Sequence, residues 1–336
     1  MDRRTFIKVS AAALAAPALV TSRALADTPK LGKMAYQLGW VKNFQFAGEY
    51  IADANKYFEQ EGIAVDLLAG GPSVSAEPIV ISGKALVGQN STDNTANAVA
   101  KGAPLKIIGT NYQKSPSSII SLTKTGLKAP KDLVGKTVGI QANNQVVWNA
   151  FLKINGIDPA SVNTVPAQHD FTPLVSGELD AFFGFSNDDV VQLRQKGQDV
   201  SYLLMADYGY PMFNCNYLVT EATLKDKEKR AQVVAFMRGA IRGWQEAVKN
   251  PALSAQLTVD VYGKGNGLDK AAQEKSAAAT NELMVTADTQ KHGLFWMTDK
   301  SVDETIATLA TAGIVAKKDL FTNEILEEAF QGKTTL

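Results

Sequence analysis

The sequence has very few of the side chains on which metal centres and disulfide frameworks depend. It contains one cysteine, Cys215, and two histidines, His169 and His292, in 336 residues. A single cysteine excludes a disulfide framework and any cysteine-clustered zinc or iron–sulfur site. Two histidines leave little for metal chemistry or for a histidine-based proton shuttle. We therefore expect no cofactor and no metal.

Neither sign of charge is in excess, and long apolar runs are missing. The 34 Lys and Arg side chains balance 34 Asp and Glu, so the formal net charge is zero. Such a chain offers no broad basic field to a nucleic-acid backbone, and we expect no nucleic-acid partner. No stretch approaches the roughly 20 apolar residues of a membrane-spanning helix. The length and the apolar content of 45% predict a globular protein with two cores.

The first 26 residues have the composition of an export signal. Residues 2–8 include the pair Arg3 and Arg4, an apolar run covers 9–20, and a small-x-small sequence ends at Ala26. A basic start, a short apolar segment and small residues before a cleavage point are typical of secretory signals. The paired arginines resemble a twin-arginine signal. We expect cleavage near Ala26 and a periplasmic location.

After this segment, strand and helix patterns alternate. Short apolar or β-branched runs, each followed by a segment with helical spacing and then a glycine, predict strands and helices in turn. Short connections of this kind favour parallel sheets covered by helices on both faces. The expected strands cover residues 34–39, 63–68, 85–88 and 105–109 in a first group, and 137–140, 162–165 and 181–185 in a second.

The remaining residues suggest that the second group is inserted into the first. From residue 222 onward the pattern is almost wholly helical, and these helices lack a sheet of their own. Two apolar stretches, 118–122 and 214–219, flank the second group, and we expect them to pair as hinge strands. The prediction is lobe one from residues 27–115 and 216–336, and lobe two from residues 116–215. Two consecutive domains divided near Thr220 are the alternative.

The predicted ligand site lies at the carboxyl ends of the strands, where parallel sheets bind their ligands. Aromatic rings there can stack on a flat ligand, and amides and hydroxyls can hydrogen-bond its edge. Some of these side chains have structural alternatives: Phe46 can pack beneath the first helix, Ser91 can cap a helix, and Asn43 and Gln45 can belong to a turn. The candidate residues are Trp40, Asn43, Gln45, Phe46, Ser73, Gln89, Ser91, Gln113, Asn144, Phe185 and Asn187.

Several short motifs resemble those of periplasmic solute-binding proteins of ABC importers. The resemblance is to the superfamily that binds thiamine-pyrimidine precursors, taurine, alkanesulfonates and nitrate. It covers about 300 residues in order and rests on Trp40, Asn43, Gly48 and Tyr50 in a W-x-x-N-x-x-x-x-G-x-Y pattern, Gly70-Gly71, and the segments 82–85, 102–106, 133–139 and 176–181.

The resemblance implies a fold, a set of partners and one more site residue. The fold is α/β, the bilobal type II periplasmic-binding-protein fold, with two mostly parallel sheets flanked by helices and a two-strand hinge. Asp188 aligns with an acidic residue that such families use on a ligand amine. The partners would be a small-molecule ligand, an ABC permease and its ATPase, with the receptor itself a monomer.

The pattern also departs from the pyrimidine branch of the superfamily. Phe46 stands where a histidine is usual, and Gln45 and Lys42 replace a shorter amide and a proline. A related pyrimidine synthase uses that histidine together with several cysteines, so Phe46 and the lone Cys215 argue against its reaction. A Cys215–His169 enzyme on the same fold is the remaining enzymatic alternative.

The expected function is therefore an extracytoplasmic receptor, not an enzyme, that closes on a small planar heterocycle. The ligand would resemble a thiamine-related pyrimidine or a flavin. A binder of an organosulfonate or an aromatic acid is the alternative, because helix N-terminal amides can hold an anion.

Overall fold

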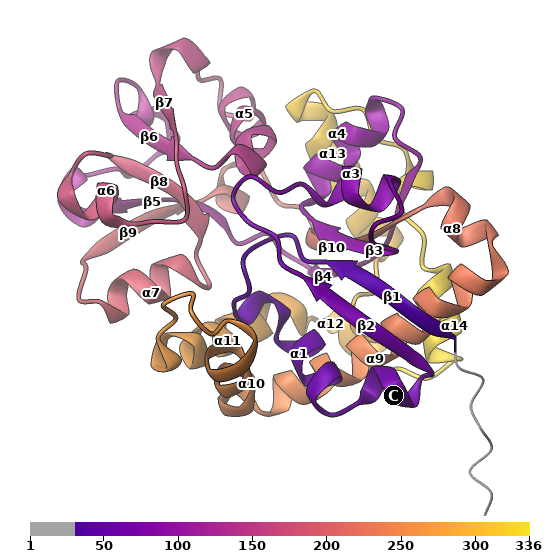
Figure 1. Cartoon of the computed structure of the whole chain (residues 1–336). Coiled ribbons are helices and arrows are strands. Elements are labelled where there is room, and N and C mark those ends of the chain that lie inside the picture. Colours follow the sequence, from indigo (N-terminus) through magenta and orange to yellow (C-terminus); the bar gives the residue numbers. More distant parts are fainter. Residues whose placement is uncertain (1–30) are drawn as a thin grey trace, which may run out of the picture.

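The computed structural model describes residues 31–336 and contains two five-stranded sheets. The predicted export signal, residues 1–26, lies outside the described residues. Figure 1 shows the two sheets side by side, with the C-terminal helices gathered around the first of them. We call the first sheet and the helices on it the first unit. The second unit is the second sheet with α5 (Gln145–Ile154), α6 (Thr172–Ser176) and α7 (Asp189–Gln195).

The first sheet has the strand order β2-β1-β3-β10-β4, and β10 runs antiparallel to both of its neighbours. The expected strand at 63–68 is present with the predicted bounds, whereas the strand at 105–109 extends further than expected, as far as Tyr112. The strands are β1 Gly32–Gln37, β2 Ile63–Leu68, β3 Val87–Asn90, β4 Leu105–Tyr112 and β10 Asn214–Thr220.

The second sheet has the order β7-β6-β8-β5-β9, and β5 runs antiparallel to β8 and β9. The chain therefore has the α/β fold class expected, with one reversed strand in each sheet. The strand β9 was not predicted, because its mixed sequence VSYLL shows no clean alternation. The strands are β5 Ser117–Leu122, β6 Thr137–Ile140, β7 Asn163–Pro166, β8 Ala181–Phe185 and β9 Val200–Leu204.

The chain crosses between the sheets twice, and the expected pairing of two hinge strands is wrong. The crossings are residues 113–116, between β4 and β5, and 205–213, between β9 and β10. β5 lies between β8 and β9, and β10 lies between β3 and β4. Each strand thus has both edges bonded within its own sheet, and no edge is left for pairing with the other. Any rotation between the units must occur in the two crossings.

The sheet membership agrees in outline with an inserted second unit. Strands of the first sheet come from residues 32–112 and 214–220, and those of the second from 117–204. The division into lobes of 27–115 with 216–336 and of 116–215 remains our proposal.

The helices cover both sheets, and the C-terminal ones return to the first unit. The segment after residue 47 forms two helices, α1 and α2, because Lys56 adopts a left-handed conformation between them. The helices are α1 Ala47–Ala54, α2 Tyr57–Gln60, α3 Ala76–Ile81, α4 Thr92–Ala100, α5 Gln145–Ile154, α6 Thr172–Ser176, α7 Asp189–Gln195, α8 Glu221–Lys225, α9 Lys227–Lys249, α10 Pro251–Leu257, α11 Lys270–Met284, α12 Ala287–His292, α13 Asp299–Ala312 and α14 Glu324–Phe330.

The largest apolar core lies between the first sheet and helices α1, α9 and α14. Glycines allow α1 and α9 to approach closely, since a Cβ at Gly243 would lie 2.0 Å from the Gly48 carbonyl oxygen. A second core joins the two units around the crossing at 205–213, where α5 packs against α13. Within residues 31–336, no helix is both long and apolar enough to cross a membrane.

Candidate functional site

A pocket lies between the two units, and the empty space in it is about 530 Å³ when the part open to solvent is included. Its walls come from loops after β1 and β3, from the first residues of β10, and from the ends of β6 and β8 with the residues that follow them. The lining residues are Gly39, Trp40, Asn43, Gln45, Asn90, Ser91, Gln141, Asn143, Asn144, Phe183, Gly184, Phe185, Asp188, Asp189, Asn214 and Cys215.

Trp40 is the aromatic side chain that the first unit brings to this pocket. It is half-buried, and its ring meets the His169 ring edge-on, with 5.6 Å between the centroids. The loop that carries it packs against Gly70, where a Cβ would lie 2.3 Å from the Leu38 carbonyl oxygen. Only glycine fits at this approach, and the loop therefore holds the indole at the boundary between the units.

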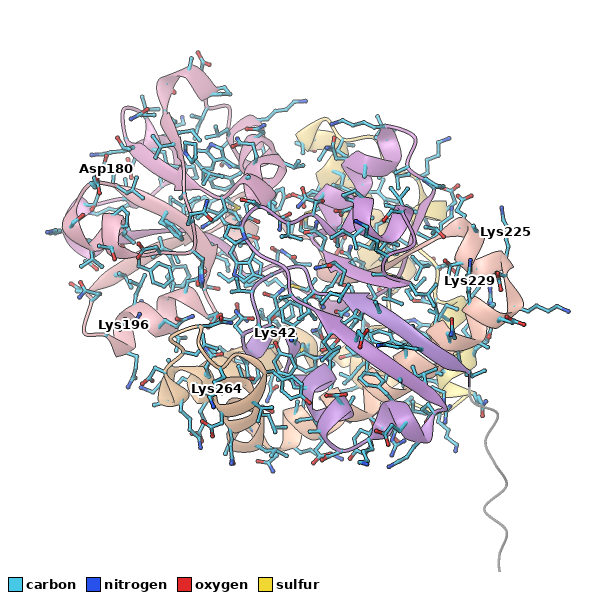
Figure 2. All side chains as sticks on the ribbon, in the orientation of Figure 1. Lys42, Asp180, Lys196, Lys225, Lys229 and Lys264 are labelled. Atoms are coloured by element: carbon cyan, nitrogen blue, oxygen red, sulfur yellow. The ribbon has the colours of Figure 1, made fainter. Side chains whose placement is uncertain are left out.

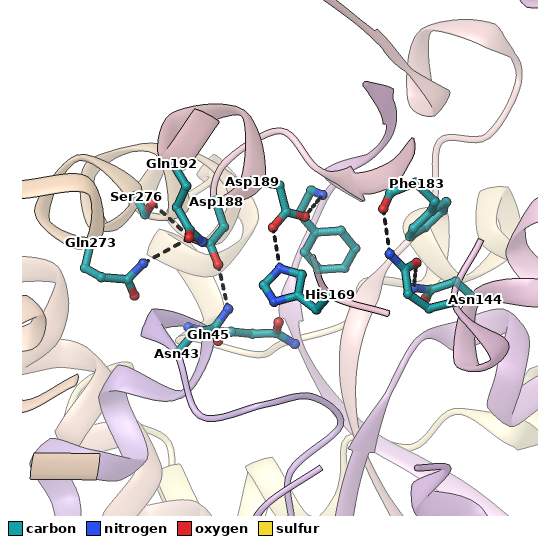
Figure 3. Close-up of polar contacts among 12 residues, drawn as sticks. Asn43, Gln45, Asn144, His169, Phe183, Asp188, Asp189, Gln192, Gln273 and Ser276 are labelled. Carbon is teal, nitrogen blue, oxygen red and sulfur yellow. Dashed lines mark hydrogen bonds and ion pairs between the residues drawn. The ribbon is translucent and has the colours of Figure 1, made fainter. Parts of the chain in front are cut away.

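Asp188 is the carboxylate at which the two units meet (Figure 3). Its Oδ2 accepts a hydrogen bond from Asn43 Nδ2 at 2.5 Å. Its Oδ1 accepts from Gln192 Nε2 at 3.0 Å, and from Gln273 Nε2 and Ser276 Oγ at 3.2 Å each. Burial, followed by the charge of Asp189, raises the pKa of Asp188 above its ordinary value. All four donors are neutral, and three of them belong to the first unit.

Asp189 holds His169 and the end of β8 in place. Its Oδ1 lies 2.9 Å from His169 Nε2, and its Oδ2 accepts from the Phe185 backbone N–H at 2.7 Å. Burial disfavours the charged imidazole, but the hydrogen bond and the charge of Asp189 outweigh it and raise the pKa of His169. His169 is therefore positioned beside Trp40 by a carboxylate of its own unit.

Cys215 forms part of the pocket floor in an uncommon backbone conformation. Its φ is +56°, in the left-handed region, and its sulfur accepts a hydrogen bond from Gln45 Nε2 at 3.1 Å. Burial, with the nearby charge of Glu49, raises the pKa of the thiol well above its ordinary value. A neutral thiol is a poor nucleophile. Cys215 is buried, and it also faces the pocket.

Amides on the opposite wall join the units through the backbone. The Asn143 N–H donates to the Pro72 carbonyl at 3.0 Å, and Asn94 Nδ2 donates to the Asn143 carbonyl at 2.8 Å. Within the second unit, Asn144 Nδ2 donates to Gln141 Oε1 at 2.9 Å. Both walls are therefore bonded across the pocket, and the structure is a closed form.

Many of the residues predicted from strand ends come together in this pocket. The structure places seven of the candidate side chains in its lining, from loops up to about 150 residues apart in sequence. Their role as ligand contacts remains a prediction. They are Trp40, Asn43, Gln45, Ser91, Asn144, Phe185 and Asp188.

Two candidates lie in or beneath the first unit's core, which corrects the prediction. Phe46 is fully buried and packs on Tyr50, with 6.4 Å between the ring centroids, because a short 3₁₀ turn directs it beneath α1. Gln89 is also fully buried and accepts from Gln45 Nε2 at 3.3 Å, so it lies one layer below the pocket surface.

Three further candidates lie away from the pocket. Ser73 is exposed in a turn, because α3 begins only at Ala76. Gln113 is in the first crossing, where its N–H donates to the Leu283 carbonyl at 2.9 Å. Asn187 turns away from the pocket, and its Nδ2 donates to Thr280 Oγ1 at 2.7 Å.

Two of the residues that the prediction missed share a geometric reason. Asn214 and Cys215 begin β10, and since β10 runs antiparallel, its first residues lie at the edge where the parallel strands end. A rule based on parallel strands cannot find them. Asp189 is the first residue of α7, and Phe183 lies within β8 with no sequence signal. Asn90, the last residue of β3, lies at a strand end and was within reach of the rule.

The pocket has acidic side chains and no basic one among its lining residues. Asp188 and Asp189 are both present, whereas no Lys or Arg lines it. Lys42, two residues after Trp40, is not in the lining, and Lys225 and Lys229 lie at the outer surface of the first unit (Figure 2). Among residues 31–336, no group of three or more His, Cys, Asp and Glu side chains is arranged to hold a metal ion.

Comparison with known proteins finds one matching family and several relatives whose names refer to pyrimidine or riboflavin binding or to pyrimidine phosphate synthesis. Residues 43–254 match the family described as NMT1/THI5 like. The formylaminopyrimidine-binding protein of Halalkalibacterium halodurans is 27% identical over 240 residues, covering 69% of this chain and 72% of that protein. The riboflavin-binding protein RibY of Chloroflexus aurantiacus is 24% identical, covering 89% of this chain and 87% of that protein.

The chain is also similar to a synthase and to a solved structure of a binding protein. The 4-amino-5-hydroxymethyl-2-methylpyrimidine phosphate synthase of Legionella pneumophila is 27% identical over 226 residues, covering 66% of this chain and 71% of that protein. The alkanesulfonate-binding protein SsuA of Xanthomonas axonopodis pv. citri, solved with MOPS bound, superposes with a TM-score of 0.62 at 16% identity, covering 88% of this chain and 97% of that one. This likeness shows a periplasmic-binding-protein fold.

Proposed function

Because the chain belongs to the NMT1/THI5-like family, we propose that it is an extracytoplasmic receptor of an ABC importer that binds a small planar heterocycle between its two units. The relatives named for binding formylaminopyrimidine and riboflavin support a ligand of this class.

The observation that carries the proposal is the chemistry of the pocket lining. Trp40 and Phe185 offer rings for stacking, while Asn43, Asn144 and Ser91 offer polar atoms for the edge of a heterocycle. Asp188 and Asp189 add carboxylates that favour N–H groups or a positive charge on the ligand. A flat, nitrogen-rich and uncharged or cationic molecule satisfies all three features.

The same lining disfavours the anionic alternative. A sulfonate or carboxylate ligand would lie near two acidic side chains, of which only Asp189 is paired with a histidine, His169, and no Lys or Arg of residues 31–336 lines the pocket. Asp93 already occupies the first turn of α4, where a free helix N-terminus would otherwise attract an anion. The organosulfonate and aromatic-acid readings are therefore the weaker candidates.

We propose a binding protein rather than a synthase or a cysteine enzyme, although several relatives carry a synthase name. Phe46 is buried in the core at the position of the synthase histidine. The raised pKa of the Cys215 thiol leaves it without nucleophilic character, and His169 is bonded to Asp189. The pocket also lacks a basic side chain to hold a phosphate.

Binding would proceed by closure of the two units. The crossings at 113–116 and 205–213 absorb the rotation, and contacts from both sides of the pocket favour the closed form. A ligand shifts this equilibrium only through its preference for the closed form over the open one. We also propose that an export signal directs the protein to the periplasm. There it would act as a monomer and deliver its ligand to an ABC permease and its ATPase.

Calorimetric titration of unfolded and refolded, ligand-free protein tests this function. Formylaminopyrimidine, riboflavin and MOPS represent the pyrimidine, flavin and sulfonate classes. We expect binding of one of the two heterocycles, no binding of MOPS, and contraction of the protein in X-ray scattering as the heterocycle is added. Tight binding of MOPS alone, or turnover of a pyrimidine precursor, would contradict the proposal.

A further inference from the structure

Helix α11 buries a stripe of polar side chains. Gln273, Ser276 and Thr280 are all fully buried, and their spacing of three and four residues places them on one face of the helix. The buried face of a helix in a globular protein is ordinarily apolar. Here three polar side chains are buried beside the apolar Ala277 and Met284, and buried polar groups require hydrogen-bond partners.

The partners of this stripe belong to the second unit. Gln273 Nε2 and Ser276 Oγ each donate to Asp188 Oδ1 at 3.2 Å. Asn187 Nδ2 donates to Thr280 Oγ1 at 2.7 Å. Figure 1 shows α11 next to α7, the helix that follows Asp188, although the two helices are far apart in sequence.

Gln273 also ties the stripe to the pocket loop of the first unit. Its Oε1 accepts from the Phe44 backbone N–H at 2.9 Å, and the neighbouring Asn43 donates to Asp188 Oδ2. None of the three α11 residues lines the pocket. The stripe thus binds the second unit at Asp188 and Asn187 without facing the ligand, and it lies outside residues 43–254 that match the family.

We propose that Gln273, Ser276 and Thr280, which we call the α11 latch, hold the closed form through Asp188 and Asn187 and set the ligand affinity without touching the ligand. Opening exchanges these hydrogen bonds for bonds to water, so the latch favours closure while leaving it reversible. The apparent affinity of a receptor rises with the fraction of molecules already in the binding-competent form. The latch residues are therefore positioning residues for binding.

Thr280→Val tests the latch most cleanly. Valine has the shape of threonine but no hydroxyl, so the buried Asn187 amide loses its partner only in the closed form. Thr280→Ser keeps the hydroxyl and serves as the rescue variant. Glu282→Gln, an exposed position on the same helix, is the control. Ser276→Ala, which removes one donor to Asp188, provides a second test if the valine variant fails to fold.

The first readout is X-ray scattering of ligand-free protein, which does not depend on the identity of the ligand. We expect wild type, Thr280→Ser and Glu282→Gln to be compact, and Thr280→Val and Ser276→Ala to have a larger radius of gyration with unchanged circular dichroism. A folded Thr280→Val or Ser276→Ala protein with the wild-type radius overturns the latch. A wild-type protein as extended as these variants overturns it as well.

The second readout is affinity for formylaminopyrimidine or riboflavin, whichever binds wild type, and it rests on the proposed function. We expect Thr280→Val to weaken binding about tenfold, as for loss of one buried hydrogen bond, and Thr280→Ser to restore it. Equal weakening by both variants would point to lost packing and overturn the proposal. If neither heterocycle binds wild type, the proposed function fails, while the scattering of ligand-free protein still decides the latch.

Discussion

The carboxyl groups of Glu49 and Asp188 are both buried, but their hydrogen-bond donors come from different parts of the molecule. Glu49, on α1 inside the first unit, accepts from Tyr217 Oη at 2.6 Å and from Trp244 Nε1 at 3.0 Å. Both of its donors belong to its own unit. Asp188 accepts three of its four hydrogen bonds from the other unit.

This difference separates a group that supports the fold from a group that supports closure. The hydrogen bonds of Glu49 are the same whether the units are open or closed. They therefore contribute to the folding stability of the first unit and not to the equilibrium between the open and closed forms. The bonds of Asp188 to Asn43, Gln273 and Ser276 break when the units separate. Substitution of Asp188 should therefore change binding, and substitution of Glu49 should change stability.

The largest expected effect is that of Asp188→Ala on ligand affinity. The variant leaves Asn43, Gln273 and Ser276 without their shared acceptor in the closed form, and each buried donor left unsatisfied costs about 1–3 kcal/mol. We expect calorimetry to show binding weakened by at least that amount for the heterocycle that binds wild type. Unchanged affinity would show that Asp188, like Glu49, contributes to folding stability and not to closure.

Glu49→Gln should remove a pH dependence of stability. Burial raises the pKa of Glu49 to about 7, whereas the unfolded chain has the ordinary value near 4.5. The folded protein therefore binds a proton that the unfolded chain releases, and this stabilisation is lost as the pH rises through about 7. Between pH 5 and 8 wild type should lose about 2–3 kcal/mol of unfolding free energy from this group.

Urea unfolding of both proteins at pH 5 and 8 measures this effect. The glutamine variant should show a smaller loss over that interval and the same ligand affinity as wild type. An identical loss in the two proteins would show that Glu49 is not the group responsible. A large loss of affinity would remove the distinction between the two carboxyls.

Trp40→Ala should weaken binding by about 1–3 kcal/mol, the contribution of a ring stacked on a flat ligand. Trp296→Ala is the matched control, since Trp296 is also half-buried and lies away from the pocket. Calorimetry should show a loss for the first variant and none for the second. Equal affinities would remove Trp40 from the site.

The smallest effect is expected for Cys215→Ser. Serine is similar in size and its hydroxyl can accept the Gln45 hydrogen bond, so binding should change by less than about 1 kcal/mol. Transport function should also be retained. Loss of a measured turnover in this variant would favour the cysteine-enzyme reading.

Local sequence patterns predicted much of the fold and part of the site. The strands β6 and β8 have their predicted bounds, because apolar runs bounded by turn residues indicate a buried strand directly. The polar residues Asn43, Ser91 and Asn144 follow such strands, and the pocket contains them.

What could not be predicted depends on contacts between distant segments. Nothing local distinguishes Phe46, which turns into the core, from Trp40, which faces the pocket. The antiparallel course of β10 brings Cys215 to the pocket edge, and strand direction is set by the whole sheet. The α11 stripe has an ordinary helical pattern, and its partners in the second unit are 85–93 residues earlier in the chain.

A crystal structure of the complex with the heterocycle that binds most tightly tests the central claim most directly. The account predicts a flat, uncharged or cationic ring stacked near Trp40 within the pocket, with contacts from both units and with Asp188 still bonded to Gln273 and Ser276. A ligand bound elsewhere, or one held by the first unit alone with the two units apart, would contradict it.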